Sequence, residues 1–433
     1  MSVLPNEPLS AQSNVNVVET TEALIDRTGS LRQLKLWGLL ITIGLASAGV
    51  AVLWGAVQSV FLALQVQRID PNGAVGGLSL IVGIGAIAAM LGAPIAGTLS
   101  DRTRTRFGGR APWILFGAVA SLALTVLMAF GTSIPMLVAY WFLMQIATNF
   151  VFTPISAHIP ERVPVIRRGA FSAVMGTMQL VGSLGGQTIG ASFSDKMVVG
   201  YILVGMIVLV TAILFVVVNR RSNLGVPKPP LNIGAILRTF WVNPVKHPNF
   251  AWAFTGRFLL MVGYFPLTAY TLYILQSYVG LGKDAVSVVP VIGLAGLLGT
   301  LIGTPISGFI VDKIKRTKPL IVAASLFLVI SFIIPMISPT VPGMWLFSFL
   351  SGLGLGAYLS VDYVLITQVL PSADEVGKDL GIINITTTLP QTIGVALGGI
   401  IVTVFSGYLA LFPIAIVFVI VGALCLFAIR GVR

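Results

Sequence analysis

Long apolar runs dominate this chain and leave little choice of environment. A helix needs roughly 20 mostly apolar residues to cross the hydrocarbon core of a bilayer, and reading for that length predicts about twelve membrane-spanning helices. Hydrophobic residues make up 56% of the chain and charged residues 9%, whereas soluble domains are about 25% charged. We therefore predict an all-α membrane protein rather than a soluble enzyme. The predicted spans cover residues 37–63, 75–99, 112–131, 134–156, 170–192, 199–219, 250–279, 286–311, 319–338, 343–369, 380–405 and 408–429.

Positive charge is concentrated in alternate loops between these spans. The formal net charge is +12, from 26 Lys and Arg against 14 Asp and Glu. With twelve spans, 22 of the 26 basic residues fall on one side, in the two tails, four loops and the central segment. Such a bias marks the cytoplasmic side, so we expect a multi-pass protein of the cell membrane with both termini in the cytoplasm. The charge is thus a topology signal and predicts no nucleic-acid partner.

Few residues are suited to metal, cofactor or covalent chemistry. Cys425 is the one cysteine and lies in an apolar run, while His158 and His247 are predicted in loops or at helix ends. No GxxxxGK phosphate-binding sequence and no HExxH zinc sequence occurs. The glycines from Gly352 to Gly356 follow no strand, so we interpret them as helix-packing positions rather than a nucleotide loop. A membrane-embedded enzyme would need a nucleophile–base pair or metal cluster within the spans; finding neither, we expect no enzymatic activity, metal or cofactor.

A repeated segment divides the chain into two halves. Residues 92–102, GAPIAGTLSDR, close the second span, and residues 303–313, GTPISGFIVDK, close the eighth at a constant offset of 211. The repeat predicts two six-helix bundles. The predicted parts are a disordered cytoplasmic tail at 1–35, bundles at 36–219 and 250–433, and a cytoplasmic linker at 220–249.

The repeated G-x-x-x-D-[RK] sequence, the twelve spans and the basic central segment resemble the major facilitator superfamily over about residues 30–430. The loop 100–113, SDRTRTRFGGRAPW, resembles that of two sugar-carrying branches, the glycoside–pentoside–hexuronide cation symporters and the plant sucrose carriers. The family implies two six-helix repeats that rock about a midplane site, which gives alternating access. The glycine-rich fifth span partly resembles drug/proton antiporters but lacks their proline.

The resemblance implies a gate at the cytoplasmic ends of the second and eighth spans. Asp101 is then expected near the start of the eleventh helix, where the positive end of the helix dipole favours a carboxylate. Arg102 and Arg110 can bridge to the opposite half, and Gly97 lets helices approach closely. The alternative is that the arginines only fix the topology. The predicted gating residues are Gly97, Asp101, Arg102, Arg110, Gly308, Asp312 and Lys313.

The resemblance also implies that spans 1, 4, 7 and 10 line a central cavity, and each of the four carries a polar stripe. Residues three, four, seven or eleven apart share a helix face, and spans 3, 6, 9 and 12 are nearly free of deep polar residues. Hydrogen bonding between helices is the alternative explanation. The predicted substrate-binding residues are Trp54, Gln58, Gln145, Asn149, Tyr264, Thr268 and Tyr358.

Arg257 and Asp362 are the two charges predicted well inside spans. Each costs about 2.5–3.5 kcal/mol at a helix centre, so each needs a partner or water. Both are expected at a similar depth and therefore to meet. The pair is either structural or a switch, in which Asp362 takes up the coupling proton and releases Arg257. No span contains a second acid, so a sodium site built from carboxylates is not favoured.

These features predict a secondary active transporter of a small polar organic solute, with a sugar or glycoside first and a proton as the symported cation. Amides bond hydroxyl groups and aromatic rings cover the CH surface of a sugar. The alternative is a major facilitator exporter of amphipathic compounds, which would have an apolar cavity. The expected partners are the solute, the proton and the bilayer, with no obligatory protein partner.

Overall fold

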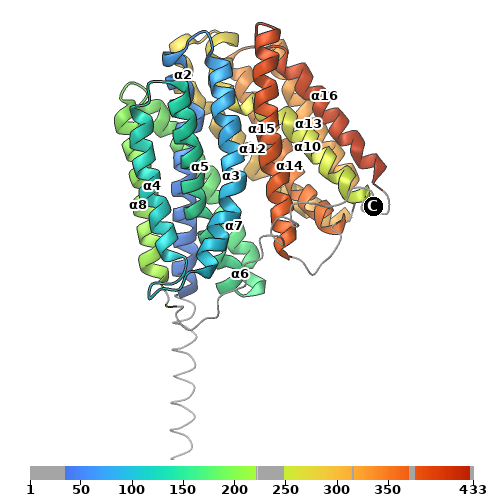
Figure 1. Ribbon diagram of the computed structural model, residues 1–433. Coiled ribbons are helices and arrows are strands. Elements are labelled where there is room, and N and C mark those ends of the chain that lie inside the picture. The colour runs from blue at the N-terminus through green and yellow to red at the C-terminus, as the bar shows by residue number, and fades with distance from the viewer. Residues whose placement is uncertain (1–34, 221, 223–247, 315, 370–375, 430–433) are drawn as a thin grey trace, which may run out of the picture.

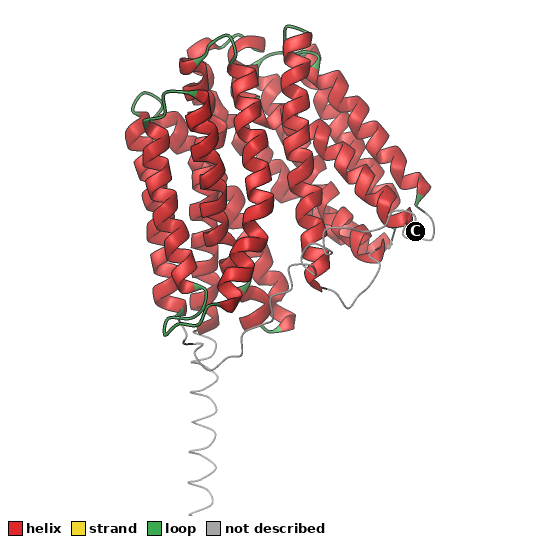
Figure 2. Ribbon diagram, viewed as in Figure 1, coloured by secondary structure: helices red, strands yellow, loops and turns green. Residues whose placement is uncertain are grey.

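The computed structural model describes residues 35–220, 222, 248–314, 316–369 and 376–429, which form helices and short connections (Figures 1 and 2). The first half contains Lys35–Ile69, α3 (Ala74–Arg102), α4 (Ala111–Ala129), α5 (Ile134–Ser156), the short α6 (His158–Arg162), α7 (Val165–Ser192) and α8 (Met197–Asn219). The second half contains α10 (Pro248–Ala269), α11 (Thr271–Tyr273), α12 (Ala285–Ile314), α13 (Lys318–Ile337), α14 (Val341–Val369), α15 (Val376–Val404) and α16 (Leu411–Cys425).

The prediction of an all-α protein with twelve spans is confirmed. Ten helices in the described residues are long and apolar enough to cross a membrane. α7 and α15 bring the long helices to twelve, and Leu389–Val404 is the apolar part of α15. Most predicted boundaries lie within a few residues of the observed ones, and α5 ends where predicted, at Ser156.

Local sequence accounts for several helix ends. α4 and α5 each carry a proline in the first turn, where the missing N–H has no helical partner to lose. Gly108 and Gly280 have φ angles of 100° and 83° in the connections after α3 and before α12. A side chain would strain both turns.

The helices form two bundles that meet along two helix pairs. In the first bundle α5 packs on α3 and α4, and α4 packs on α8. In the second bundle α14 packs on α12 and α13, while α10 packs on α15 and α16. Across the boundary, α3 contacts α15 and α7 contacts α12. Figure 1 shows the two bundles lying together at the upper end of the view and diverging toward the lower end.

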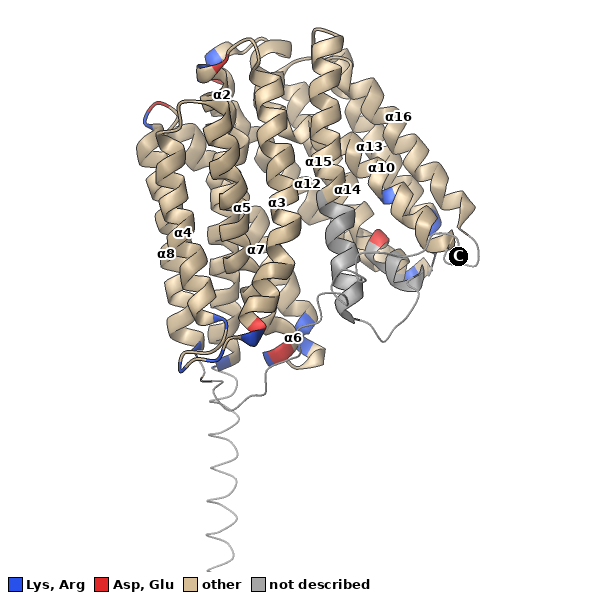
Figure 3. Ribbon diagram, in the orientation of Figure 1, with Lys and Arg blue, Asp and Glu red and all other residues tan. Residues whose placement is uncertain are grey.

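Basic residues mark one end of both bundles, here called the basic end (Figure 3). By the helix bounds, it carries Arg102, Arg110 and Arg162 of the first bundle and Lys313 and Lys318 of the second. Some basic residues of the predicted cytoplasmic side lie outside the described part, namely Arg27, Arg32, Arg221, Lys228, Arg238, Lys246, Lys315, Arg430 and Arg433. The tail 1–34, most of the linker 220–249, and His247 lie outside it as well.

At the opposite end, hydrogen bonds join the two halves. The Gln67 amide donates to the Gln276 side chain at 3.2 Å, and the Tyr273 hydroxyl donates to the Ala63 carbonyl at 2.8 Å. The hydroxyl of Tyr270 contacts that of Ser79. A π-helical turn occurs here in each half: η1 (Val57–Phe61) lies within the first long helix, and η2 (Ile274–Tyr278) follows α11. The opposite end is therefore closed in this structure.

Glycines set the close helix contacts inside each bundle. A Cβ at Gly186 of α7 would overlap the Val52 carbonyl of the first helix, and one at Gly352 of α14 would overlap the Gly296 carbonyl of α12. A Cβ at Gly354 would lie 3.0 Å from the Ala324 carbonyl. These contacts agree with the packing role inferred for the glycine-rich stretches.

Candidate functional site

A central cavity of about 410 Å³ lies between the two bundles. Its walls come from the first helix and α7 on one side, and from α10, α12, α14 and α15 on the other. The polar side chains that line it are Trp54, Gln58, Ser59, Ser183, Gln187, Tyr264, Thr268, Thr271, Thr300, Ser348 and Gln391. The volume is in the range typical of small-molecule sites.

Four of the predicted binding residues line this cavity: Trp54, Gln58, Tyr264 and Thr268. The Trp54 ring packs on Phe152, with 5.9 Å between ring centroids, and its indole Nε1 has no hydrogen-bond partner in the described part of the chain. Thr268 already donates its hydroxyl to the Phe265 carbonyl at 3.0 Å. The indole N–H is thus buried without a partner beside the cavity in this conformation.

The structure does not bring Gln145, Asn149 and Tyr358 to the cavity. Gln145 and Asn149 are each 9% exposed, and the Asn149 amide donates to the Gln145 carbonyl at 2.8 Å. A Cβ at Gly92 of α3 would lie 3.2 Å from the Asn149 Cβ, so this face of α5 packs on α3. Tyr358 is 3% exposed and turns toward Asp362. The polar residues Gln145 and Asn149 of span 4 therefore belong to the contact between α5 and α3. Contact between helices was the alternative explanation for the polar stripes.

Sequence reasoning missed two cavity amides, Gln187 of α7 and Gln391 of α15. A Cβ at Gly293 would overlap the Gln187 Oε1, so the bare Cα of Gly293 makes room for that amide. A signal for Gln391 existed in the sequence, because it aligns with Gln179 at an offset of 212 between the halves.

The three glutamine amides of the cavity are open to a ligand. Within the described residues, the side chains of Gln58, Gln187 and Gln391 make no hydrogen bond to another residue. Each amide offers two donors and one acceptor with two lone pairs. Gln58 and Gln187 belong to the first bundle and Gln391 to the second, so one solute can be held by both bundles.

The two charges predicted inside spans do meet. Arg257 Nη1 lies 2.6 Å from Asp362 Oδ2, and the Tyr358 hydroxyl donates to the other carboxylate oxygen at 3.3 Å. The exposed fractions are 7% for Arg257 and 1% for Asp362. Asp362 is one turn from Leu359, which lines the central cavity. The pair is thus buried one helical turn beyond the cavity along α14.

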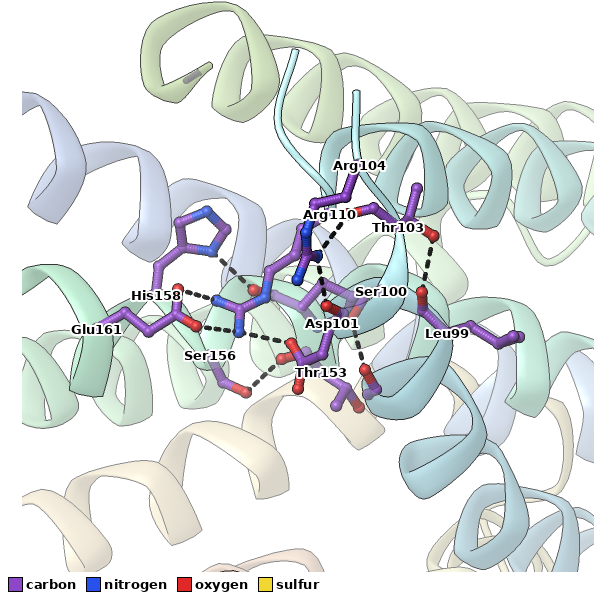
Figure 4. A network of polar contacts seen from close by, with 12 residues as sticks. Leu99, Ser100, Asp101, Thr103, Arg104, Arg110, Thr153, Ser156, His158 and Glu161 are labelled. Carbon is purple, nitrogen blue, oxygen red and sulfur yellow. Dashed lines mark hydrogen bonds and ion pairs between the residues drawn. The ribbon is translucent and has the colours of Figure 1, made fainter. Parts of the chain in front are cut away.

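Two predicted gating residues of the first half, Asp101 and Arg110, lie together in a polar network at the basic end (Figure 4). Arg110 contacts Asp101 at 2.8 Å and both oxygens of Glu161 at 2.6 Å, so it ties the end of α3 to α6. Glu161 had not been predicted. All three residues belong to the first bundle, and Arg102 Nη1 is buried with no hydrogen-bond partner in the described residues. The bridge to the other half stays a prediction.

The remaining gating residues show no tight contact. A Cβ at Gly97 would lie 3.7 Å from Thr153, and one at Gly308 would lie 3.5 Å from Ser360, which is ordinary van der Waals spacing. Lys313 is exposed at the end of α12. The side chain of Asp312 lies outside the described part. Close approach at Gly97 and Gly308 is therefore not a feature of this conformation.

Comparison with known proteins gives one family and one fold. The family model for the Major Facilitator Superfamily matches residues 39–372 and 301–432. The arabinose-proton symporter of Bacillus subtilis (strain 168) is 33% identical over 111 residues, which are 25% of this chain and 24% of that protein. The matched stretch thus spans about a quarter of the curated relative.

Solved structures share the fold at low sequence identity. A D-xylose-proton symporter superposes with a TM-score of 0.66 at 16% identity, over 92% of this chain and 98% of its own. A bacterial homologue of the human lysosomal transporter Spinster, inward-facing and unoccupied, gives 0.67 at 16% identity over 92% and 96%. The nucleoside transporter NupG gives 0.69 at 12% identity over 91% and 100%.

Proposed function

The chain belongs to the Major Facilitator Superfamily, and within that family of transporters we propose that it is a secondary active symporter of a sugar or glycoside with a proton. The observation that carries the proposal is the central cavity, where three uncommitted glutamine amides lie beside the aromatic rings of Trp54 and Tyr264. This donor and acceptor set suits a neutral polyol. An anionic substrate would call for a basic residue, and no Lys or Arg lines this cavity in the described residues.

The binding mode follows from the chemistry of the lining. Glutamine amides accept from and donate to vicinal hydroxyls, and the faces of Trp54 and Tyr264 cover the CH surface of a pyranose or furanose ring. Two of the similar proteins are described as arabinose-proton and D-xylose-proton symporters. Pentoses are therefore the first solutes to test, and nucleosides, which carry a pentose, are the second.

The orientation we propose places the basic end in the cytoplasm, because cytoplasmic loops are enriched in Lys and Arg. The chain then enters and leaves on the cytoplasmic side of the cell membrane, and the closed end faces outward. Closure by the Gln67–Gln276 and Tyr273–Ala63 contacts corresponds to an inward-facing state. In the outward-facing state these contacts break and the basic ends of the bundles come together.

For coupling, we assign the proton to Asp362. In this state its carboxylate is balanced by Arg257 at 2.6 Å and by the Tyr358 hydroxyl. Protonation removes the negative charge, so the Arg257 cation loses its partner and α10 and α14 lose the contact that ties them at this depth. For gating, we propose that Asp101, Arg102, Arg110 and Glu161 close the basic end. Gly97 and Gly308 would allow the helices to pack there. Asp312 and Lys313 are the counterparts of Asp101 and Arg102 in the second half.

Equilibrium binding to the purified protein tests the substrate class. We expect arabinose, xylose or a glycoside to bind, and Gln187→Ala to weaken binding about tenfold, because one buried amide contact contributes about 1–1.5 kcal/mol. Thr188→Ala is the matched control, since Thr188 is the exposed neighbour whose hydroxyl already donates to the Leu184 carbonyl. Tight binding of amphipathic dyes with no binding of polyols would instead support the exporter.

A further inference from the structure

Gln187 of α7 and Gly293 of α12 face each other across the boundary between the two bundles. Both line the central cavity, and α7 and α12 form one of the two helix pairs that join the bundles. A Cβ built on Gly293 would overlap the Gln187 Oε1 and would lie 3.0 Å from its Cδ and 3.4 Å from its Nε2. The whole amide of Gln187 therefore lies over the bare Cα of Gly293.

The packing of α7 on the first helix determines where Gln187 points. A Cβ at Gly182 of α7 would overlap the Ala48 carbonyl of the first helix. One at Gly186 would overlap the Val52 carbonyl. These two backbone contacts fix the rotation of α7 about its axis. Gln187 follows Gly186 by about 100° around the helix, which turns it from the first helix toward the boundary with α12.

α12 is fixed to its own bundle in the same way. A Cβ at Gly303 of α12 would overlap the Leu353 carbonyl of α14. Gly293 differs from Gly303, because the three heavy atoms nearest to a Cβ there all belong to the side chain of Gln187 in the opposite bundle. The missing side chain at Gly293 thus makes room for an amide of the solute cavity rather than for a helix of its own bundle.

Contact with Gly293 restricts an amide that has no other anchor. In the described part of the chain the Gln187 side chain makes no hydrogen bond. A glutamine side chain that a ligand must first immobilise loses rotamer freedom on binding. An amide already confined against α12 loses less, so confinement before binding favours affinity.

We propose that Gly293 is a positioning residue for solute binding: its Cα forms the seat on which the Gln187 amide rests, and this seat directs the amide toward a solute hydroxyl. The proposal rests on the proposed function in that the solute is a polyol bound in the central cavity. Because the seat belongs to the second bundle and the amide to the first, the amide is held only in conformations in which α7 and α12 meet at this level. The affinity for the solute then differs between conformations, which allows the solute to shift the equilibrium between them.

Thermal unfolding of the purified protein tests the seat without any solute. The matched control is Gly185→Ala in α7, where the atom nearest to a Cβ is the Val52 Cγ2 at 4.0 Å. Both substitutions gain helix propensity, so a difference between them reports the contact. We expect Gly293→Ala to give a lower Tm than Gly185→Ala in the parent. The difference should vanish in the Gln187→Ala background, where the amide is absent.

Solute titration tests the positioning. We expect Gly293→Ala to weaken arabinose and xylose binding about fivefold in the parent and less than about twofold in the Gln187→Ala background. The ratio of the two affinities should also change by about threefold, because a displaced amide meets a different hydroxyl of the solute. A loss of packing alone would weaken both solutes alike. Gly185→Ala should keep both affinities.

The outcomes separate the seat from the proposed function. Equal effects of Gly293→Ala in the parent and in the Gln187→Ala background, on Tm and on affinity, would overturn the proposal. A Tm difference that depends on Gln187 with parental affinities and an unchanged ratio would also overturn it, because Gly293 would then be a packing residue alone. If the parent bound no polyol, the proposed function would fail, while a Tm difference that depends on Gln187 would still support the seat.

Discussion

Replacing Asp362 by asparagine separates a proton carrier from a structural ion pair. Asn keeps the size of the side chain and an oxygen that accepts from Arg257 or from the Tyr358 hydroxyl, but it cannot lose or gain the coupling proton. If Asp362 carries the proton, accumulation of solute against its gradient should vanish. Exchange of preloaded solute should persist, because exchange requires binding and rocking but no net proton movement. Both rates are measured in proteoliposomes with an imposed pH gradient.

The stability of the same variant can be bounded from the geometry. Arg257 is 7% exposed and Asp362 is 1% exposed, and removing one partner of a buried pair costs about 3–5 kcal/mol. We expect the lower end of that range, since Asn retains an acceptor 2.6 Å from the guanidinium. Thermal unfolding in detergent should show the loss, and Arg257→Gln/Asp362→Asn should recover much of it.

The double variant decides the matter. It lacks the buried cation, so its folding no longer depends on the carboxylate, and any transport defect that remains belongs to coupling. We expect it to exchange solute and not to concentrate it. Concentrative uptake by Arg257→Gln/Asp362→Asn would refute the assignment of the proton to Asp362 and leave the pair a structural one.

Three further predictions concern the cavity, the packing and the gate. Gln58→Ala should weaken solute binding about tenfold and leave the stability unchanged. Asn149→Ala should lower the free energy of unfolding by about 1–3 kcal/mol and leave solute binding nearly unchanged. Solute titration and thermal unfolding measure the two effects, and the reverse pattern would contradict the assignment of Gln58 to the cavity and Asn149 to the helix contact. Gly186→Ala should impair folding because its Cβ overlaps a carbonyl, while Gly176→Ala, where nothing lies within 4 Å, should be tolerated in an expression and unfolding assay. Asp101→Asn should raise cysteine labelling at the basic end and slow cycling, and unchanged labelling with parental uptake would exclude a gate there.

The fold could be predicted because spanning a membrane requires the same apolar length in every helix. The predicted and observed bounds of α5 agree for this reason. The seventh span was predicted as one helix over 250–279, but α10 ends at Ala269. α10 continues through Pro266, and beyond Ala269 the chain passes at Tyr270 into the short α11 and the π-helical turn η2. A hydropathy window does not register that change.

The face of each helix that meets the cavity was harder to predict. A polar stripe shows that a helix has a polar face. The direction of that face depends on which neighbouring helix offers the more complementary packing surface, and the stripe alone does not identify that helix. α3 presents Gly85 and Gly92 to α5, and these glycines admit Trp141 and Asn149. The span 4 stripe is therefore used within the bundle. Gln187 lies on α7, outside the four spans that the family resemblance assigns to the cavity, so the polar stripes of those four spans do not predict it.

The position of the overlooked amides bears on how binding is linked to movement. α7 contacts α12 and α15 contacts α3, so Gln187 and Gln391 stand on the two helices that cross the boundary between the bundles. A ligand shifts an equilibrium between two states only by its difference in affinity for them. A solute can form hydrogen bonds with Gln187 and Gln391 at the same time only in conformations in which the two bundles lie close together at the level of the central cavity. A solute that reaches one amide alone gains the same contact in every state. It would occupy the cavity without favouring closure, so reach across the boundary decides which polyols are carried as well as bound.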